Sequence, residues 1–187
     1  LALERIEEST RMKPDFLEAW RALSSLYAAS TRPADALAAS DRTLELAAGD
    51  VEALRNRYDA LVELGRGDEA RAALAALVAV DRTPETARLV FNLGADAMKA
   101  GDHAAARGHF ASALELDPNL HQAHSALAEI QIGAKDFAGA IAELDKVLAL
   151  SPRNFVAWER KIEVLKAMGK ADEAAEAQRK LVELRGN

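Results

Sequence analysis

Alanine recurs along this sequence at a nearly constant interval. The alanines at what we call the alanine position are Ala36, Ala70, Ala106, Ala140 and Ala174, and successive members stand 34, 36, 34 and 34 residues apart. A fixed period of this length is the signature of a repeat array, in which each repeat buries its apolar face against its neighbours. The period therefore predicts an elongated array of similar units, and the function has to be sought in that array.

Two other positions keep the same period. The tryptophan position holds Trp20, Leu54, Val90, His124 and Trp158. The proline position holds Pro14, Ala48, Arg82, Pro118, Pro152 and Gly186. Because three independent positions share one interval, chance is a poor explanation, and each period is expected to fold as one structural unit.

Each period contains two predicted helices, as residues 119–152 illustrate. Apolar residues recur at helical spacing in both halves of this segment, and the polar pair Lys135-Asp136 separates them. Pro152 ends the second half, because proline disfavours helix at the residue before it. The alanine position is predicted to lie where the two helices cross closely, since a side chain larger than a methyl group would push them apart.

The period predicts an all-α chain of eleven helices without strands, forming a single solenoid domain over 1–187. It consists of a half-repeat over 1–16 and full repeats over 17–50, 51–86, 87–120, 121–154 and 155–187, with two extra residues lengthening the turn near 82–86. The chain opens on Leu1 rather than methionine, so we expect it to be part of a longer protein. Leu1, Leu3 and Ile6 lack the helix that they would cover, which predicts weak self-association at that end.

Charge and composition limit the classes of partner. The net charge of −6 and the pI of about 5.3 argue against nucleic-acid binding, which needs clustered cations. No apolar run approaches the ~20 residues of a membrane-spanning helix. The absence of cysteine excludes disulfides and thiolate metal sites. These features predict a soluble protein, and a cytoplasmic location is favoured over a periplasmic one.

No residue pattern indicates catalysis, a cofactor or a metal. His121 and His124 stand three residues apart and could share a ligand, but His124 occupies the tryptophan position and is expected to be packed. Acidic pairs such as Asp68-Glu69 lie at predicted helix starts, where they favour the helix dipole. We therefore expect no catalytic residue, no cofactor and no metal.

The repeat resembles the tetratricopeptide repeat family over nearly the whole chain. The first repeat keeps the family's pattern at Trp20, Leu23 and Tyr27, and the third keeps it at Leu93-Gly94, Gly101, Ala106, Phe110, Ala113 and Pro118. Arg57 and Lys161 depart from it at the position where leucine is usual. The resemblance implies a right-handed superhelix whose first helices line a concave face.

On that face, donors, amides and a few apolar residues form a candidate peptide-binding groove. Its residues are Arg21, Ser25, Arg55, Asn56, Arg88, Phe91, Asn92, Met98 and Lys99. The resemblance implies a non-enzymatic scaffold for protein–protein interaction that holds a partner segment there. The alternative is an accessory domain that recruits substrate or regulates activity within a larger enzyme-containing, secretion or assembly protein.

Chaperone-binding members of the resembled family clamp the C-terminal carboxylates of a partner with lysine and asparagine. The matching residues of this chain are Arg21, Ser25, Asn56, Arg88 and Asn92. Ser25 stands where asparagine is usual and Asn92 where a cation is usual, so the clamp is incomplete. The resemblance therefore implies weak binding of an acidic-ended peptide, opposed by the nearby acids Glu52, Asp59 and Glu63.

Overall fold

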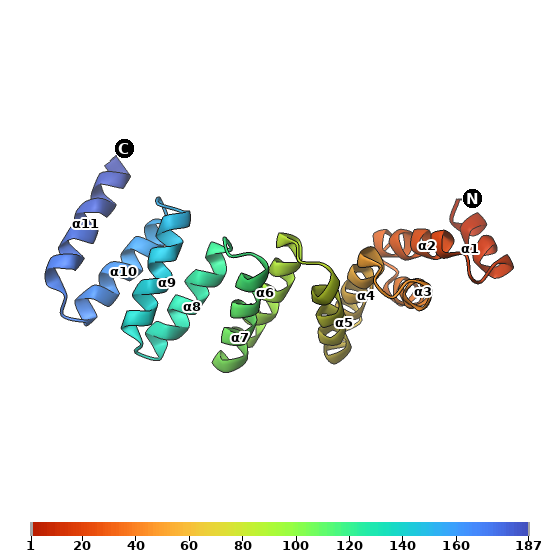
Figure 1. Ribbon diagram of the computed structural model, residues 1–187, viewed down its shortest axis with the longest axis horizontal. Coiled ribbons are helices and arrows are strands. Elements are labelled where there is room, and N and C mark those ends of the chain that lie inside the picture. Colours follow the sequence, from red (N-terminus) through yellow and green to blue (C-terminus); the bar gives the residue numbers. More distant parts are fainter. Residues whose placement is uncertain (1, 187) are drawn as a thin grey trace. The chain divides into compact units, whose positions relative to one another are not determined.

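A computed structural model of the chain describes residues 2–186, so the expectation placed on Leu1 lies outside it. Within those residues the protein consists of eleven α-helices and no strand (Figure 1), which confirms the predicted all-α fold class. The helices are α1 Ala2–Met12, α2 Leu17–Ala29, α3 Pro33–Leu46, α4 Val51–Glu63, α5 Gly67–Val80, α6 Pro84–Lys99, α7 His103–Leu116, α8 His121–Gly133, α9 Phe137–Leu150, α10 Phe155–Ala167 and α11 Ala171–Gly186. None of these helices is long and apolar enough to cross a bilayer.

The chain divides into two compact units, Leu1–Arg82 and Thr83–Asn187. Helices pack in consecutive pairs, α2 with α3 and α4 with α5 in the first unit, and α6 with α7, α8 with α9 and α10 with α11 in the second. The single domain over 1–187 and the handedness of its superhelix stay predictions.

The segment at 82–86, expected as a lengthened turn, already contains the start of a helix. The hydroxyl of Thr83 accepts a hydrogen bond from the Thr86 N–H, and Pro84 occupies the first turn of α6. A threonine cap followed by proline favours helix initiation, because proline has no N–H to leave unpaired and its φ is already helical. The helix consequently begins three residues before the expected repeat boundary at 87.

The alanine position is buried in every helix pair, as a close approach of the two helices there requires. All five alanines are buried, and Ala106 and Ala140 have no exposed surface. Left-handed residues follow the first helix of each pair, and three of them are Gly65, Gly101 and Gly169, whose φ angles are 69°, 80° and 74°. Thr31 and Lys135 take the equivalent place with φ of 51° and 61°. The helix pairs therefore keep one geometry although their turn residues differ.

The tryptophan and proline positions share one hydrogen bond. The indole Nε1 of Trp20 donates to the Pro14 carbonyl oxygen at 2.9 Å, and Trp158 donates to Pro152 at the same distance. His124 Nε2 lies 3.3 Å from the Pro118 oxygen. In these three repeats the bond joins the first helix to the turn before it, whereas Leu54 and Val90 at the same position have no side-chain donor. The bond also shows that His124, which is 7% exposed, is a packed residue.

Arg57 and Lys161 stand at the position of the repeat where leucine is usual, and each is paired with an aspartate. Arg57 contacts Asp41 at 2.7 Å, and Lys161 contacts Asp145 at 2.5 Å. In both cases the acid lies sixteen residues earlier, on the second helix of the preceding repeat. A cation thus replaces leucine only where the preceding repeat supplies a carboxylate.

The first helix is joined to the next repeat by a hydrogen bond from Tyr27. The phenol donates to Glu7 Oε1 at 2.6 Å, while Leu3 and Ile6 are half-buried. Burial, followed by the bond to the Glu7 carboxylate, raises the pKa of Tyr27 to about 12. The self-association expected at this end stays a prediction.

We expect Ala140→Leu to destabilise the protein far more than Ala138→Leu. Ala140 is fully buried at a helix crossing, and overpacking there typically costs about 1–3 kcal/mol, whereas Ala138 is exposed on the same helix. Thermal unfolding of the two variants measures the difference. Equal melting temperatures would contradict the assigned packing.

A charge exchange tests the pairing of Lys161 with Asp145. Lys161→Glu places two acids together, so we expect a loss of about 1 kcal/mol, and adding Asp145→Lys should recover most of it. Urea unfolding of the wild type, both single variants and the double variant gives the coupling free energy. Additive losses would show that the pair does not contribute.

Candidate functional site

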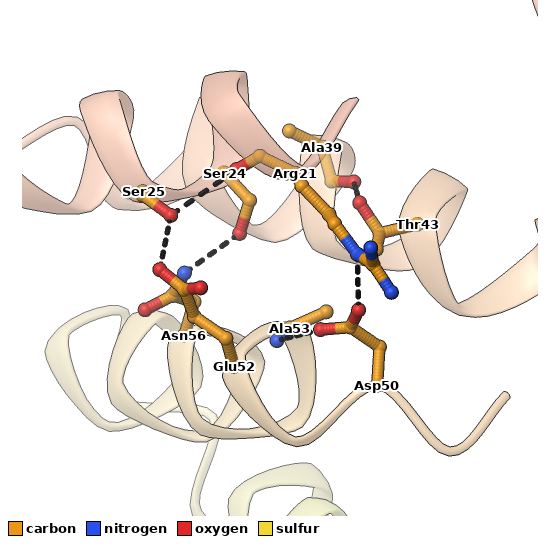
Figure 2. Close-up of polar contacts among 9 residues, drawn as sticks. All are labelled: Arg21, Ser24, Ser25, Ala39, Thr43, Asp50, Glu52, Ala53 and Asn56. Atoms are coloured by element: carbon orange, nitrogen blue, oxygen red, sulfur yellow. Dashed lines mark hydrogen bonds and ion pairs between the residues drawn. The ribbon is translucent and has the colours of Figure 1, made fainter. Parts of the chain in front are cut away.

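In the first unit, the expected ligand donors on α2 are bound to α4 (Figure 2). The Arg21 guanidinium forms an ion pair with the Asp50 carboxylate, which also accepts the Ala53 N–H and so caps α4. The Ser25 hydroxyl lies 2.5 Å from a Glu52 carboxylate oxygen and 3.1 Å from the carbonyl oxygen of Arg21. These donors connect neighbouring repeats in the structure.

The two expected donors on α4 are also engaged. The Asn56 amide donates to Ser24 Oγ at 2.9 Å, and Ser24 Oγ lies 2.8 Å from Ser40 Oγ in the interior, so a polar chain links α4, α2 and α3. Arg55 contacts the buried Asp81 carboxylate at 2.9 Å. Removing Arg55 would take an ion-pair partner from this buried carboxylate, which is costly.

Acidic residues on α4 make this face unfavourable for another carboxylate. Asp59 is exposed, yet the surrounding protein removes part of its solvation and raises its pKa; Arg55 opposes this effect and Glu63 adds to it by repulsion. An incoming carboxylate would meet the same repulsion. A ligand of the first unit would therefore have to displace existing pairs and overcome like charge.

In the second unit, three of the expected groove residues have structural contacts. The Phe91 ring is half-buried and packs on Phe110, with ring centroids 5.3 Å apart and planes tilted by 39°. Met98 is also half-buried, and Lys99 pairs with Asp96 one turn earlier at 2.9 Å. Phe91 thus has a packing partner on α7, and its role as a peptide contact stays a prediction.

Gly94 explains how Phe110 reaches the interior beside α6. A Cβ atom at Gly94 would lie 2.6 Å from the Phe110 ring, well inside van der Waals contact. The glycine of the Leu93-Gly94 pair therefore has a packing role, because it leaves room for the aromatic side chain.

Arg88 and Asn92 differ from the other expected groove residues. Both side chains are exposed on α6, four residues apart and hence on one face of the helix. Neither forms a hydrogen bond or ion pair with any residue between 2 and 186. The five N–H donors of the guanidinium and the two of the amide are exposed to solvent, as a binding surface requires.

A groove of about 330 Å³ lies between α8 and α10 in the same unit. Its lining residues are His121, Gln122, Ser125, Glu129, Leu144, Asn154, Val156, Ala157 and Arg160. Arg160 and Glu129 form a 2.8 Å ion pair between the two helices, and Val156 is 67% exposed. Val156 occupies the same position in its repeat as Gln122 does one repeat earlier and Arg88 two repeats earlier. The groove therefore continues the face of α6 that carries Arg88.

Sequence reasoning placed the candidate site in the first three repeats and left this groove out. The exposed Val156 at a concave-face position was the available signal, because an apolar side chain on a solvated helix face needs an explanation. The pairing of the first-unit donors gave no such signal, since their partners on other helices come from 26 to 32 residues away in the sequence.

A polar cluster surrounds the packed His124 on another face of the second unit. Its Nδ1 lies 2.6 Å from Glu143 Oε2, and Lys146 contacts the other carboxylate oxygen at 2.9 Å. Burial raises the pKa of Glu143, but the hydrogen bonds from Lys146 and His124 outweigh it and hold that pKa below its usual value. The carboxylate thus joins α8 to α9.

We expect Glu143→Gln to destabilise the protein by about 1–3 kcal/mol near neutral pH, because it removes charge-assisted hydrogen bonds. The pKa of Glu143 is lower in the folded protein than its unfolded value of about 4.5, so the ionised carboxylate stabilises the fold at any pH above 4.5. This stabilisation is lost as the pH falls through the folded-state pKa. Unfolding free energies measured from pH 7 to pH 3 should converge for the two proteins. A constant difference over that range would contradict the assignment.

Known proteins show the same repeat and fold. A family model described as tetratricopeptide repeat matches residues 56–121 and 125–187, and a second model of that description matches 97–146. No protein with curated annotation is similar enough in sequence to count as a relative.

Among solved structures, the chain resembles a crystal structure of the MamA protein, with 18% identity, a TM-score of 0.62 and coverage of 91% of this chain and 92% of that one. It also resembles YrrB, described as having an unusual peptide-binding site, with 16% identity, a TM-score of 0.64 and coverage of 99% and 94%. Pseudomonas aeruginosa PilF matches with 21% identity, a TM-score of 0.58 and coverage of 96% and 81%. These similarities establish the shared fold.

Proposed function

Because these models match more than half of its residues, the chain belongs to the tetratricopeptide repeat family, and we propose that it is a non-enzymatic scaffold whose second unit binds an extended partner segment. The binding surface comprises the exposed face of α6 and the groove between α8 and α10. This proposal moves the site from the first three repeats to the last three.

The availability of Arg88 and Asn92 is the observation that carries the proposal. Both are exposed and have no partner within residues 2–186, whereas Arg21, Arg55 and Asn56 are engaged with neighbouring helices. A ligand that binds Arg88 and Asn92 displaces no partner of these side chains, so no free energy is spent on breaking an existing contact.

The side chains also define the kind of segment that fits. Arg88 can hold a carboxylate through two parallel hydrogen bonds, and the Asn92 amide can pair with a peptide group of an extended chain. Further along the face, the exposed Val156 offers an apolar contact. An acidic-ended peptide is therefore expected to place its carboxylates at α6 and its preceding residues along α8 and α10.

The test compares a short peptide ending in two aspartates with its C-terminal amide, followed by NMR of the Asn56 and Asn92 side-chain amides. We expect the peptide with the free C-terminal carboxylate to shift the NMR signal of the Asn92 amide and to leave that of Asn56 unchanged. Its affinity should be micromolar to millimolar and should fall as salt rises. Arg88→Ala should weaken binding about ten-fold, because a charge-assisted pair is lost.

Arg107→Ala is the matched control, since Arg107 is an exposed arginine of the same unit on α7. It should bind the peptide as the wild type does. Equal loss in both arginine variants would indicate non-specific charge attraction, and a response at Asn56 would return the site to the first unit.

A further inference from the structure

A second cavity of the second unit lies between α7 and α9, away from the proposed peptide face. It has a volume of about 480 Å³ and is lined by Leu114, Pro118, His124, Lys146, Ala149 and Leu150. Its walls are mostly apolar, and His124 at its base is occupied by Glu143 and the Pro118 carbonyl. This size and lining fall in the range of ligand sites in proteins.

The chain contains two equivalents of this place, and a cation paired with an acid lies beside the tryptophan in both. At Trp20, the guanidinium of Arg42 lies 5.8 Å from the indole ring and forms an ion pair with Glu45. At Trp158, Lys180 pairs with Glu183 at 3.0 Å, and both residues line the cavity beside the indole. A cation and an acid three residues later thus recur over the tryptophan position.

At His124 the acid is missing. The equivalent residues are Lys146 and Ala149, each 104 residues after Arg42 and Glu45 and 34 before Lys180 and Glu183. Lys146 instead contacts Glu143, while its side chain remains 53% exposed. An ammonium group has three N–H donors, so Lys146 can donate a further hydrogen bond to a second carboxylate.

We propose that the groove between α7 and α9 is a docking site for a partner protein segment that carries a leucine- or phenylalanine-sized side chain next to a carboxylate. The apolar side chain packs against Leu114, Ala149 and Leu150. The carboxylate pairs with Lys146 and takes the place that Glu45 and Glu183 occupy beside their own cations. Two observations indicate a ligand with a carboxylate. Lys146 is a cation of complementary charge, and the sites at Trp20 and Trp158 each have an acid where the site at His124 has none.

The site is tested on the full chain with the dipeptide acetyl-Phe-Glu-amide as the probe and acetyl-Phe-Gln-amide as its neutral match. Methyl NMR of Leu114, Ala149 and Leu150 reports the groove. We expect both dipeptides to shift these methyl groups, with the glutamate form binding about two- to five-fold more tightly, the contribution of one exposed ion pair.

Ala149→Glu rebuilds the ion pair present at the two tryptophan sites and places an acid beside Lys146, where the ligand carboxylate would bind. The glutamate dipeptide should therefore lose its advantage over the glutamine dipeptide, as the methyl groups of Leu114 and Leu150 report. Ala142→Glu, an acid at another exposed position of α9, should leave that advantage unchanged. Both substitutions lie on the surface, so both variants should fold, as circular dichroism will verify. Equal affinities of the two dipeptides for the wild type, an unchanged glutamate advantage in Ala149→Glu, or shifts produced by octanoate and not by either dipeptide would overturn the proposal.

Discussion

The close crossing of two antiparallel helices at a methyl-sized side chain is the constraint on which the structure depends. Ala106 and Ala140 are completely buried there, and Ala36, Ala70 and Ala174 nearly so. Once this contact sets the distance between paired helices, the remaining positions follow. Trp20 and Trp158 can reach back to the proline carbonyl because α2 and α10 each start three residues after that proline.

Polar side chains on the first helices differ in their surroundings between the two units. In the first unit, Arg21 and Asn56 connect adjacent repeats, and the buried Ser24–Ser40 contact continues this chain of polar groups. Buried polar groups that are fully hydrogen-bonded specify one arrangement of their helices. In the second unit, the same helical face leaves Arg88 and Asn92 in solvent, so that binding can use them.

The sequence was sufficient to predict the fold, because a period of 34 residues with alanine and proline at fixed places determines helix, turn and helix. The start of α6 was missed, since the insertion at 82–86 reads as a turn until the Thr83 cap and Pro84 are considered together. The candidate site was harder to predict. Arg21 and Arg88 look alike in sequence, and only their surroundings in space show that one is paired with Asp50 and the other is exposed.

The aspartates opposite Arg57 and Lys161 have a consequence for how such an array can change by duplication. A repeat that begins with one of these cations keeps its ion pair only after a repeat that ends with the matching acid. If the repeat were copied behind the repeat that precedes Leu127, the cation would face Ala111, which stands where the aspartate is needed. Such a copy would lose the ion pair, a cost of up to about 1 kcal/mol at a partly exposed position.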